Sequence, residues 1–346
     1  KNFLMRWADA QMIDGRHMLE CALVFLQQNH PLRPKLNVSM LSGVNVTADA
    51  SSSSSSSLSS SSSPSSSSPS HELFIVTPRV QDWGIIRNIP AALLSLQEFT
   101  QSIELSSEMV RFGGLNLLVA WARTFQKRGE HAHYLETISC LITVASNNPF
   151  CCNKMVQMGM MEVITEWLQE SSNDNLAEQK KLMLLATSVV DMDPEATLRF
   201  VNSGGLGYLR SVLASNETKL QERAIDLMMS LTFENKVDGL SHLILNHEGF
   251  VDDLKRIITH NSSDIRTIGR TLLMNLAKAG PTERRIIRTE GLQQTLIDRL
   301  MDENGVGFDE RWSLAQITRV IQEHRDDAVN VQQGKDLKTE EDFVEF

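Results

Sequence analysis

One recurring unit constrains the fold of this chain more than any other feature of its sequence. Glycines that follow an apolar, helix-like turn occur at Gly114, Gly159, Gly205, Gly249 and Gly291. Their spacings are 45, 46, 44 and 42 residues, a nearly constant period. Glycine adopts the left-handed conformation at a helix end without a Cβ penalty, so each position predicts a break between two helices. A period of this length predicts stacked helical units.

Residues 200–234 show what one unit contains. Their sequence indicates the end of a short helix, a glycine turn, a medium helix, a polar break and a long helix that Ser215 or Asn216 caps. The long helix has apolar residues at three- and four-residue steps: Leu220, Ala224, Leu227, Met228 and Leu231. Three helices in about 40–47 residues are typical of armadillo repeats. The sequence therefore predicts an all-α, right-handed armadillo-type solenoid of about five three-helix repeats.

The chain divides into four expected regions. They are an amphipathic helical segment at 1–34, a serine-rich linker at 35–72, the repeat domain at 73–323 and a polar acidic tail at 324–346. We expect the linker to be disordered, because a serine tract cannot bury enough apolar surface to offset its ordering entropy. In the repeat domain we expect a capping helix at 90–103. The expected repeats follow at 104–146, 147–190, 191–233, 234–279 and 280–323.

Charge and hydropathy exclude two classes of partner. The net charge is −10, which disfavours binding to nucleic acid, since phosphate contacts need clustered Lys and Arg. We interpret the densest basic cluster, Arg284, Arg285 and Arg288, as the solvated face of a short helix. No apolar run approaches the ~20 residues that span a bilayer. We expect a monomer that contacts neither nucleic acid nor membrane.

Two short patterns begin like catalytic or cofactor motifs and then depart from them. Residues 205–210 resemble a dinucleotide fingerprint, but Arg210 takes the place of the third glycine. His247 and Glu248 begin like a zinc-protease motif, yet Val251 replaces its second histidine. Neither pattern supports a cofactor site.

The histidines and cysteines offer only a weak alternative. His131 and His133 are two residues apart, so on a helix they point about 200° apart, which disfavours a metal site shared with Cys140. The adjacent Cys151 and Cys152 lack good disulfide geometry. We therefore expect no enzyme activity, no cofactor and no metal, and an enzyme using these residues stays the weakest hypothesis.

Binding in armadillo arrays usually occurs on the concave face, which the third helix of each repeat lines. The polar residues expected there form a mixed-charge surface suited to a folded protein partner. The candidate partner-binding residues are Glu136, Ser139, Thr143, Lys181, Ser188, Glu222, Asp226, Ser230, Arg266 and Asn275.

Peptide-binding arrays such as importin-α carry a ladder of Trp and Asn on those helices, and this chain does not. The tryptophan positions hold Ser139, Leu184, Asp226, Thr271 and Ala315. The asparagine positions hold Thr143, Ser188, Ser230, Asn275 and Arg319. With one Asn and no Trp, the pattern argues against a peptide-ladder importin.

Part of the sequence resembles a known family. Residues 96–104 (LQEFTQSIE) lead through 109–115 (MVRFGGL), and 145–149 (ASNNP), 179–188 (QKKLMLLATS) and 200–206 (FVNSGGL) follow. This is similar to the armadillo domain of nucleotide-exchange factors for 70-kDa heat-shock chaperones, the Fes/Hsp-binding-protein type and its endoplasmic-reticulum relatives. The likeness covers about residues 90–235. The Asp-Asn-Ala usual after the first helix is replaced around residues 105–107.

The resemblance implies a co-chaperone that cradles the ATPase domain of a 70-kDa chaperone and promotes ADP release. It implies no covalent chemistry. The alternative is a general armadillo scaffold for another protein. A faint likeness of residues 3–8 to cytosolic members, and the lack of a retention tetrapeptide at Phe346, favour the cytoplasm over the endoplasmic-reticulum lumen.

Overall fold

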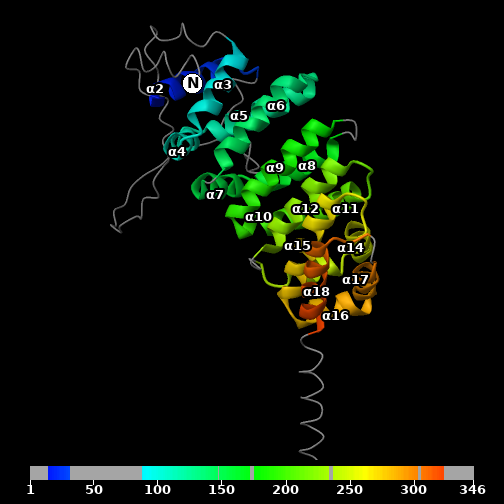
Figure 1. Ribbon diagram of the computed structural model, residues 1–346. Coiled ribbons are helices and arrows are strands. Elements are labelled where there is room, and N and C mark those ends of the chain that lie inside the picture. Colours follow the sequence, from blue (N-terminus) through cyan, green and yellow to red (C-terminus); the bar gives the residue numbers. More distant parts are fainter. Residues whose placement is uncertain are drawn as a thin grey trace, which may run out of the picture. The chain divides into compact units, whose positions relative to one another are not determined.

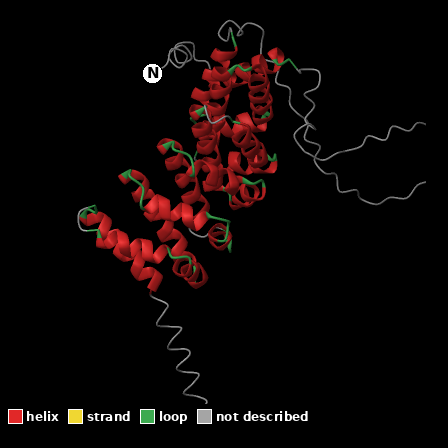
Figure 2. Ribbon diagram, turned by 90° about the vertical axis from the view of Figure 1, so that its right-hand side faces the viewer, coloured by secondary structure: helices red, strands yellow, loops and turns green. Residues whose placement is uncertain are grey.

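A computed structural model describes residues 15–31, 88–146, 148–171, 175–233, 237–302 and 305–322. This part of the chain contains seventeen helices, α2 to α18, and no strand (Figure 2). The predicted linker at 35–72 and tail at 324–346 lie outside the described residues, as do 1–14 and 32–34 of the predicted helical segment. No helix in the described part is long and apolar enough to cross a bilayer.

The chain forms two compact units, 1–144 and 145–346. The first unit contains α2 (Gly15–Asn29), α3 (Ile89–Phe99), α4 (Ile103–Arg111), α5 (Gly114–Arg128) and all but the last residue of α6 (His131–Ala145). Helices α4, α5 and α6 make up one triplet of the predicted kind. Helix α2 packs against α3, α4 and α5.

The second unit holds four further triplets (Figure 1). Their first helices are α7 (Pro149–Gln157), α10 (Pro194–Asn202), α13 (Leu240–Leu245) and α16 (Pro281–Thr289). Their second helices are α8 (Met160–Glu170), α11 (Gly205–Leu213), α14 (Phe250–Ile258) and α17 (Leu292–Met301). Their third helices are α9 (Leu176–Met192), α12 (Thr218–Thr232), α15 (Ser263–Ala279) and α18 (Phe308–Gln322). The prediction of five three-helix repeats is confirmed.

The turn between first and second helices is made by a left-handed glycine in every triplet. These glycines have φ between +71° and +89°: Gly113, Gly159, Gly204, Gly249 and Gly291. In two triplets the predicted glycine was one residue late, because Gly114 and Gly205 are already the first residues of their helices. Glycine is needed there for space, since a Cβ on Gly114 would lie 2.6 Å from Cγ of Met109 and one on Gly205 would meet the Phe200 ring.

Two local predictions were wrong. The capping helix expected at 90–103 is shorter: α3 ends at Phe99, and the hydroxyl of Thr100 donates to the Leu96 carbonyl at 2.7 Å as the chain turns into α4. Neither Ser215 nor Asn216 caps α12, which begins at Thr218 without a side-chain cap.

The core follows the predicted apolar stripes. All five stripe residues named for α12 are at most 3% exposed. The third helices pack on one another in sequence, α9 on α12, α12 on α15 and α15 on α18. They form one continuous layer in the second unit, as stacking repeats must if each is to bury its apolar face.

The basic cluster on α16 is not the solvated face that we expected. Arg284 is 8% exposed, and its Nη1 donates to the Ala277 carbonyl at the end of α15. Arg288 donates to the Ile321 carbonyl at 2.6 Å, and only Arg285 is exposed. The arginines instead satisfy carbonyls at the ends of third helices, which have no partner within their own helix.

Candidate functional site

Successive third helices of the second unit present equivalent residues to solvent. We call these residues the third-helix face; all are exposed or half-buried. They are Ala177, Lys181, Leu184, Ser188 and Asp191 on α9; Lys219, Arg223, Asp226, Ser230 and then Phe233 on and after α12; Asp264, Ile268, Thr271, Asn275 and Lys278 on α15; and Phe308, Trp312, Ala315, Arg319 and Gln322 on α18. The equivalent residues Lys219 on α12 and Asp264 on α15 interact electrostatically. A hydrogen bond to Glu222, and then the charges of Glu222 and Asp264, raise the pKa of Lys219.

Charges on α12 pair along the helix. Lys219 Nζ lies 2.8 Å from Glu222 Oε2, and Arg223 Nη1 lies 3.5 Å from Asp226 Oδ2. Burial raises the pKa of Asp226, and Arg223 acts against that shift. Together with Glu222, the third-helix face carries five basic and four acidic side chains, whereas the whole chain has a net charge of −10.

The last helix of the face is aromatic. Phe308 is 81% exposed and Trp312 is 62% exposed, and they lie one helical turn apart. The equivalent residues on α9, α12 and α15 are also exposed or half-buried, although another repeat follows each of these helices: Ala177, Lys219, Asp264, Lys181, Arg223 and Ile268. The exposure of Phe308 and Trp312 therefore follows from their place on the face and not from the end of the array.

Sequence reasoning missed this aromatic pair, although the signal was present. The buried residues of α18 are Leu314, Ile317 and Ile321. Phe308 and Trp312 fall outside that stripe, and large apolar side chains out of phase with the core are the ones to suspect of binding.

Most of the predicted partner-binding residues lie on exposed or half-buried positions of third helices. Those on the third-helix face are Lys181, Ser188, Asp226, Ser230 and Asn275, with Glu222 beside them. Those on α6, in the first unit, are Glu136, Ser139 and Thr143. The hydroxyls of Ser139, Thr143 and Ser188 each donate to the carbonyl four residues earlier, at 2.8, 3.0 and 2.9 Å.

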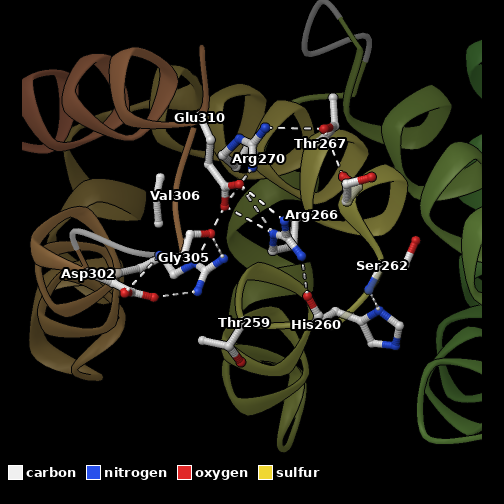
Figure 3. A network of polar contacts seen from close by, with 12 residues as sticks. Thr259, His260, Ser262, Arg266, Thr267, Arg270, Asp302, Gly305, Val306 and Glu310 are labelled. Carbon is white, nitrogen blue, oxygen red and sulfur yellow. Dashed lines mark hydrogen bonds and ion pairs between the residues drawn. The ribbon is translucent and has the colours of Figure 1, made fainter. Parts of the chain in front are cut away.

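Arg266 is placed differently from the other predicted site residues. Figure 3 shows its guanidinium between Glu310 and the backbone of His260. Its side chain is 12% exposed, and its Nη1 donates to the carbonyls of His260 and Asn261 at 2.7 and 2.9 Å. Its Nε and Nη2 donate to the two carboxylate oxygens of Glu310, at 3.0 and 3.2 Å. At the equivalent position of the preceding repeat, Gln221 donates to the carbonyl of Leu213 at the end of α11 and to that of Ser215 in the loop that follows. Arg266 thus closes a turn and joins α15 to α18.

Glu310 is the counter-ion of three arginines. Besides Arg266, Nη1 of Arg270 and Nε of Arg299 lie 3.2 and 3.4 Å from its Oε1. Burial alone would raise the pKa of Glu310, but the hydrogen bond from Arg266 and the charges of the three arginines hold it below its usual value. The carboxylate therefore stays ionised to a lower pH than an ordinary glutamate does.

Arg270 occupies a core position of the repeat. The equivalent residues of the other triplets are fully buried and apolar: Ile138, Met183, Ile225 and Leu314. Burial lowers the pKa of Arg270, and Glu310 offsets this only partly. Its Nε is buried without a hydrogen-bond partner. The buried charge of Arg270 lowers the stability of the fold, whereas an aliphatic side chain at this position would raise it.

Among the described residues, no group of three or more His, Cys, Asp or Glu side chains is placed to hold a metal ion. All four cysteines are buried. Burial raises the pKa of Cys152 to about 12, and its thiol donates to the Ala145 carbonyl at 3.2 Å. Such a thiol is inert, because the thiolate is the nucleophile.

Comparisons with known proteins identify the fold. No family model and no curated protein matches the sequence. An engineered protein of known structure is 20% identical, with a TM-score of 0.56 over 68% of this chain and 90% of its own. A designed armadillo repeat protein in complex with the peptide (KR)4 is 14% identical, with a TM-score of 0.56 over 67% of this chain and 92% of its own.

A further match is among computationally designed armadillo repeat proteins for modular peptide recognition. It is 13% identical, with a TM-score of 0.53 over 67% of this chain and 92% of its own. Likenesses at these identities concern the fold alone. The fold is therefore an armadillo-like repeat fold, as the glycine period predicted.

Proposed function

We propose that this chain is a non-enzymatic scaffold that binds a folded protein through the third-helix face. The exposed pair Phe308 and Trp312 carries the proposal. Side chains as exposed as these add little to the stability of α18, whereas large aromatic side chains dominate binding energy when a partner buries them.

The charges of the face fit the same role. Lys219, Glu222, Arg223 and Asp226 form two ion pairs at the surface, where such pairs add little to stability. Charges around an aromatic anchor orient a partner and select against wrong ones. The face combines an apolar anchor with a mixed-charge surround, the usual composition of a protein interface.

A folded partner fits this face better than an extended basic peptide. One of the similar designed proteins is bound to (KR)4, a purely basic peptide. The third-helix face here is nearly balanced in charge, and of the ladder asparagines it has only Asn275. A basic peptide would meet Lys219 and Arg223 as well as their acidic neighbours.

Within this proposal, the partner is the ATPase domain of a 70-kDa heat-shock chaperone. The likeness of residues 96–115 to exchange factors for these chaperones supports it. The scaffold would accelerate ADP release by binding the open state of the ATPase domain more tightly than the closed one, since only a difference in affinity shifts such an equilibrium. We propose the cytoplasm as the compartment, with the endoplasmic-reticulum lumen as the alternative.

Binding of the purified ATPase domain and its rate of ADP release test both parts of the proposal, the binding face and the identity of the partner. The double variant Phe308→Ala/Trp312→Ala is expected to weaken binding by at least about 30-fold, the loss of a hot spot of 2 kcal/mol or more. Its matched control is Leu198→Ala, which removes a 41% exposed apolar side chain from α10, away from the face.

The possible outcomes distinguish an error about the partner from an error about the binding face. If the ATPase domain does not bind, the chaperone is not the partner; if it binds but saturating protein leaves ADP release unchanged, the chain is not an exchange factor. If a different folded protein then binds and depends on Trp312, the chain is a general armadillo scaffold. If binding of every partner is unaffected by the double variant, the face is not the binding surface.

A further inference from the structure

We propose that α3, α4 and α5 form a binding site for an amphipathic helix, and that the chain's own α2 occupies it. This site lies in the first unit and is independent of the third-helix face. Helix α2 contacts all three of these helices. Its ligand class is a helix with large aliphatic residues at three- and four-residue steps.

The contact surface of α2 is apolar and almost completely buried. Leu19, Ala22 and Leu26 are 0% exposed, and Leu23 is 7% exposed. A Cβ on Gly114, the first residue of α5, would lie 3.1 Å from Cδ2 of Leu23, so the two helices touch closely there. The residues at the end of α2, Gln27 to Asn29, are exposed.

The end of α2 is fixed by polar contacts to α5. Nε1 of Trp121 donates to the carbonyl of Leu26 at 3.1 Å. This carbonyl is one of the last four of α2, which have no partner within the helix. Nε2 of His30 lies 3.2 Å from the Thr124 hydroxyl, and the His30 and Trp121 rings form a T-shaped pair with centroids 4.8 Å apart. The site thus recognises where the helix ends as well as its apolar face.

The contacts of α2 are those of a second helix in an additional, split repeat. In the second unit, α8 packs on α9 of its own repeat and on α11 of the next, and α14 packs on α15 and α17. Helix α2 packs on α3 and α5 in the same pattern. The sulfhydryl of Cys140 on α6 donates to the Leu93 carbonyl at 3.2 Å, so α3 holds the place of the third helix.

The length of the connection between α2 and α3 distinguishes this repeat from the five triplets. Second and third helices are joined by two to six residues in the five triplets, whereas residues 30–88 join α2 to α3. By chain length alone, the local concentration of α2 at its site is about 50-fold lower than on a four-residue loop. Helix α2 is therefore held mainly by its contacts, and a helix of the same pattern on another molecule competes for its place.

Cutting the connection in the full-length protein tests this directly. A recognition site for a specific protease is placed within residues 51–57, and complete cleavage is verified by mass. We expect the amino-terminal fragment to bind with a dissociation constant of about 1 μM or lower. At a protein concentration of about 1 μM it should therefore elute from gel filtration together with the rest of the chain. A labelled peptide of residues 15–31 should then exchange with it.

Two matched variants of the cut protein make the result specific. Leu26→Asp places a charge in the buried face of α2 and is expected to weaken retention and peptide binding by at least about 100-fold, since a buried unpaired charge is costly. Gln28→Asp adds the same charge on the exposed side and should leave both unchanged.

Three results would overturn the proposal. One is separation of the wild-type fragment together with no peptide binding at about 100 μM. Another is equal retention of the Leu26→Asp and wild-type fragments. The third is a dimer of the uncut chain that the Leu26→Asp variant abolishes, because the occupant would then be the α2 of a second copy.

Discussion

Nε of Arg210 on α11 donates to Oδ2 of Asp253 on α14 at 3.0 Å, joining the second helices of successive repeats. Asp253 is 2% exposed and also pairs with Arg256 of its own helix. The guanidinium of Arg210 reaches it over the turn at Gly249, where a Cβ would collide with Nη2. The glycine thus permits both the left-handed turn and the ion pair between repeats.

Gly249→Ala is expected to destabilise the second unit more than Gly291→Ala. Both residues have φ above +70°, so each substitution costs about 1–2 kcal/mol of left-handed strain. Nothing lies within 4 Å of a Cβ on Gly291, whereas Gly249→Ala also displaces Arg210 from a buried carboxylate. That adds about 1–3 kcal/mol. Urea unfolding measures the difference, and equal losses in the two variants would contradict it.

Glu310→Gln is expected to destabilise the second unit by about 3 kcal/mol at pH 7, because it leaves buried arginines without their counter-ion. The pKa of Glu310 is lowered in the folded protein, so its contribution is complete above its ordinary pKa and is lost as pH falls through the folded value. Unfolding measured from pH 7 to pH 3 should show this loss in the wild type and not in the variant.

Asp309→Asn is the matched control for that measurement. Asp309 is the exposed neighbour of Glu310, so removing its charge should change stability by less than about 0.5 kcal/mol. A loss as large as that of Glu310→Gln would mean that the negative charge of α18 matters in general and not the pairing with arginines.

The fold and most of the residues of the third-helix face followed from the sequence, but the placement of Arg266 did not. Left-handed glycines mark where each second helix begins, yet α8, α11 and α17 are 11, 9 and 10 residues long and α5 has 15. Counting from the glycine therefore misplaces the third helix, and an error of one residue turns a side chain by about 100°. Arg266 was expected on the face, but it lies two residues before Ile268, which occupies the equivalent position there.

Arg270→Leu is expected to leave the second unit unchanged or to stabilise it by about 1 kcal/mol. The substitution restores the aliphatic residue of the other repeats, and Glu310 keeps Arg266 and Arg299. Arg266→Leu should instead cost about 3 kcal/mol, because it removes two hydrogen bonds from Glu310 and leaves two loop carbonyls unpaired. Thermal unfolding distinguishes them; similar losses would show that both arginines hold the repeats together.

His30 makes the docking of α2 sensitive to pH. Its side chain is 2% exposed between Trp121 and Thr124, and burial lowers its pKa, with the charge of Arg128 acting in the same direction. The unfolded chain therefore takes up the proton first. The contribution of neutral His30 to the docking of α2 is complete above the ordinary histidine pKa of about 6.5. It falls as pH drops from there toward the pKa that His30 has in the folded protein.

The measurement is retention of the amino-terminal fragment by the cut protein at pH 7.5 and pH 5.5. We expect weaker retention at the lower pH, because protonation of His30 places a charge in a buried site, where it loses its hydration. His30→Asn should remove this dependence on pH, since an amide does not titrate in this range. His131→Asn, at an exposed position of α6, should leave it intact. If the His30 variant keeps the full pH dependence, another group controls the release of α2.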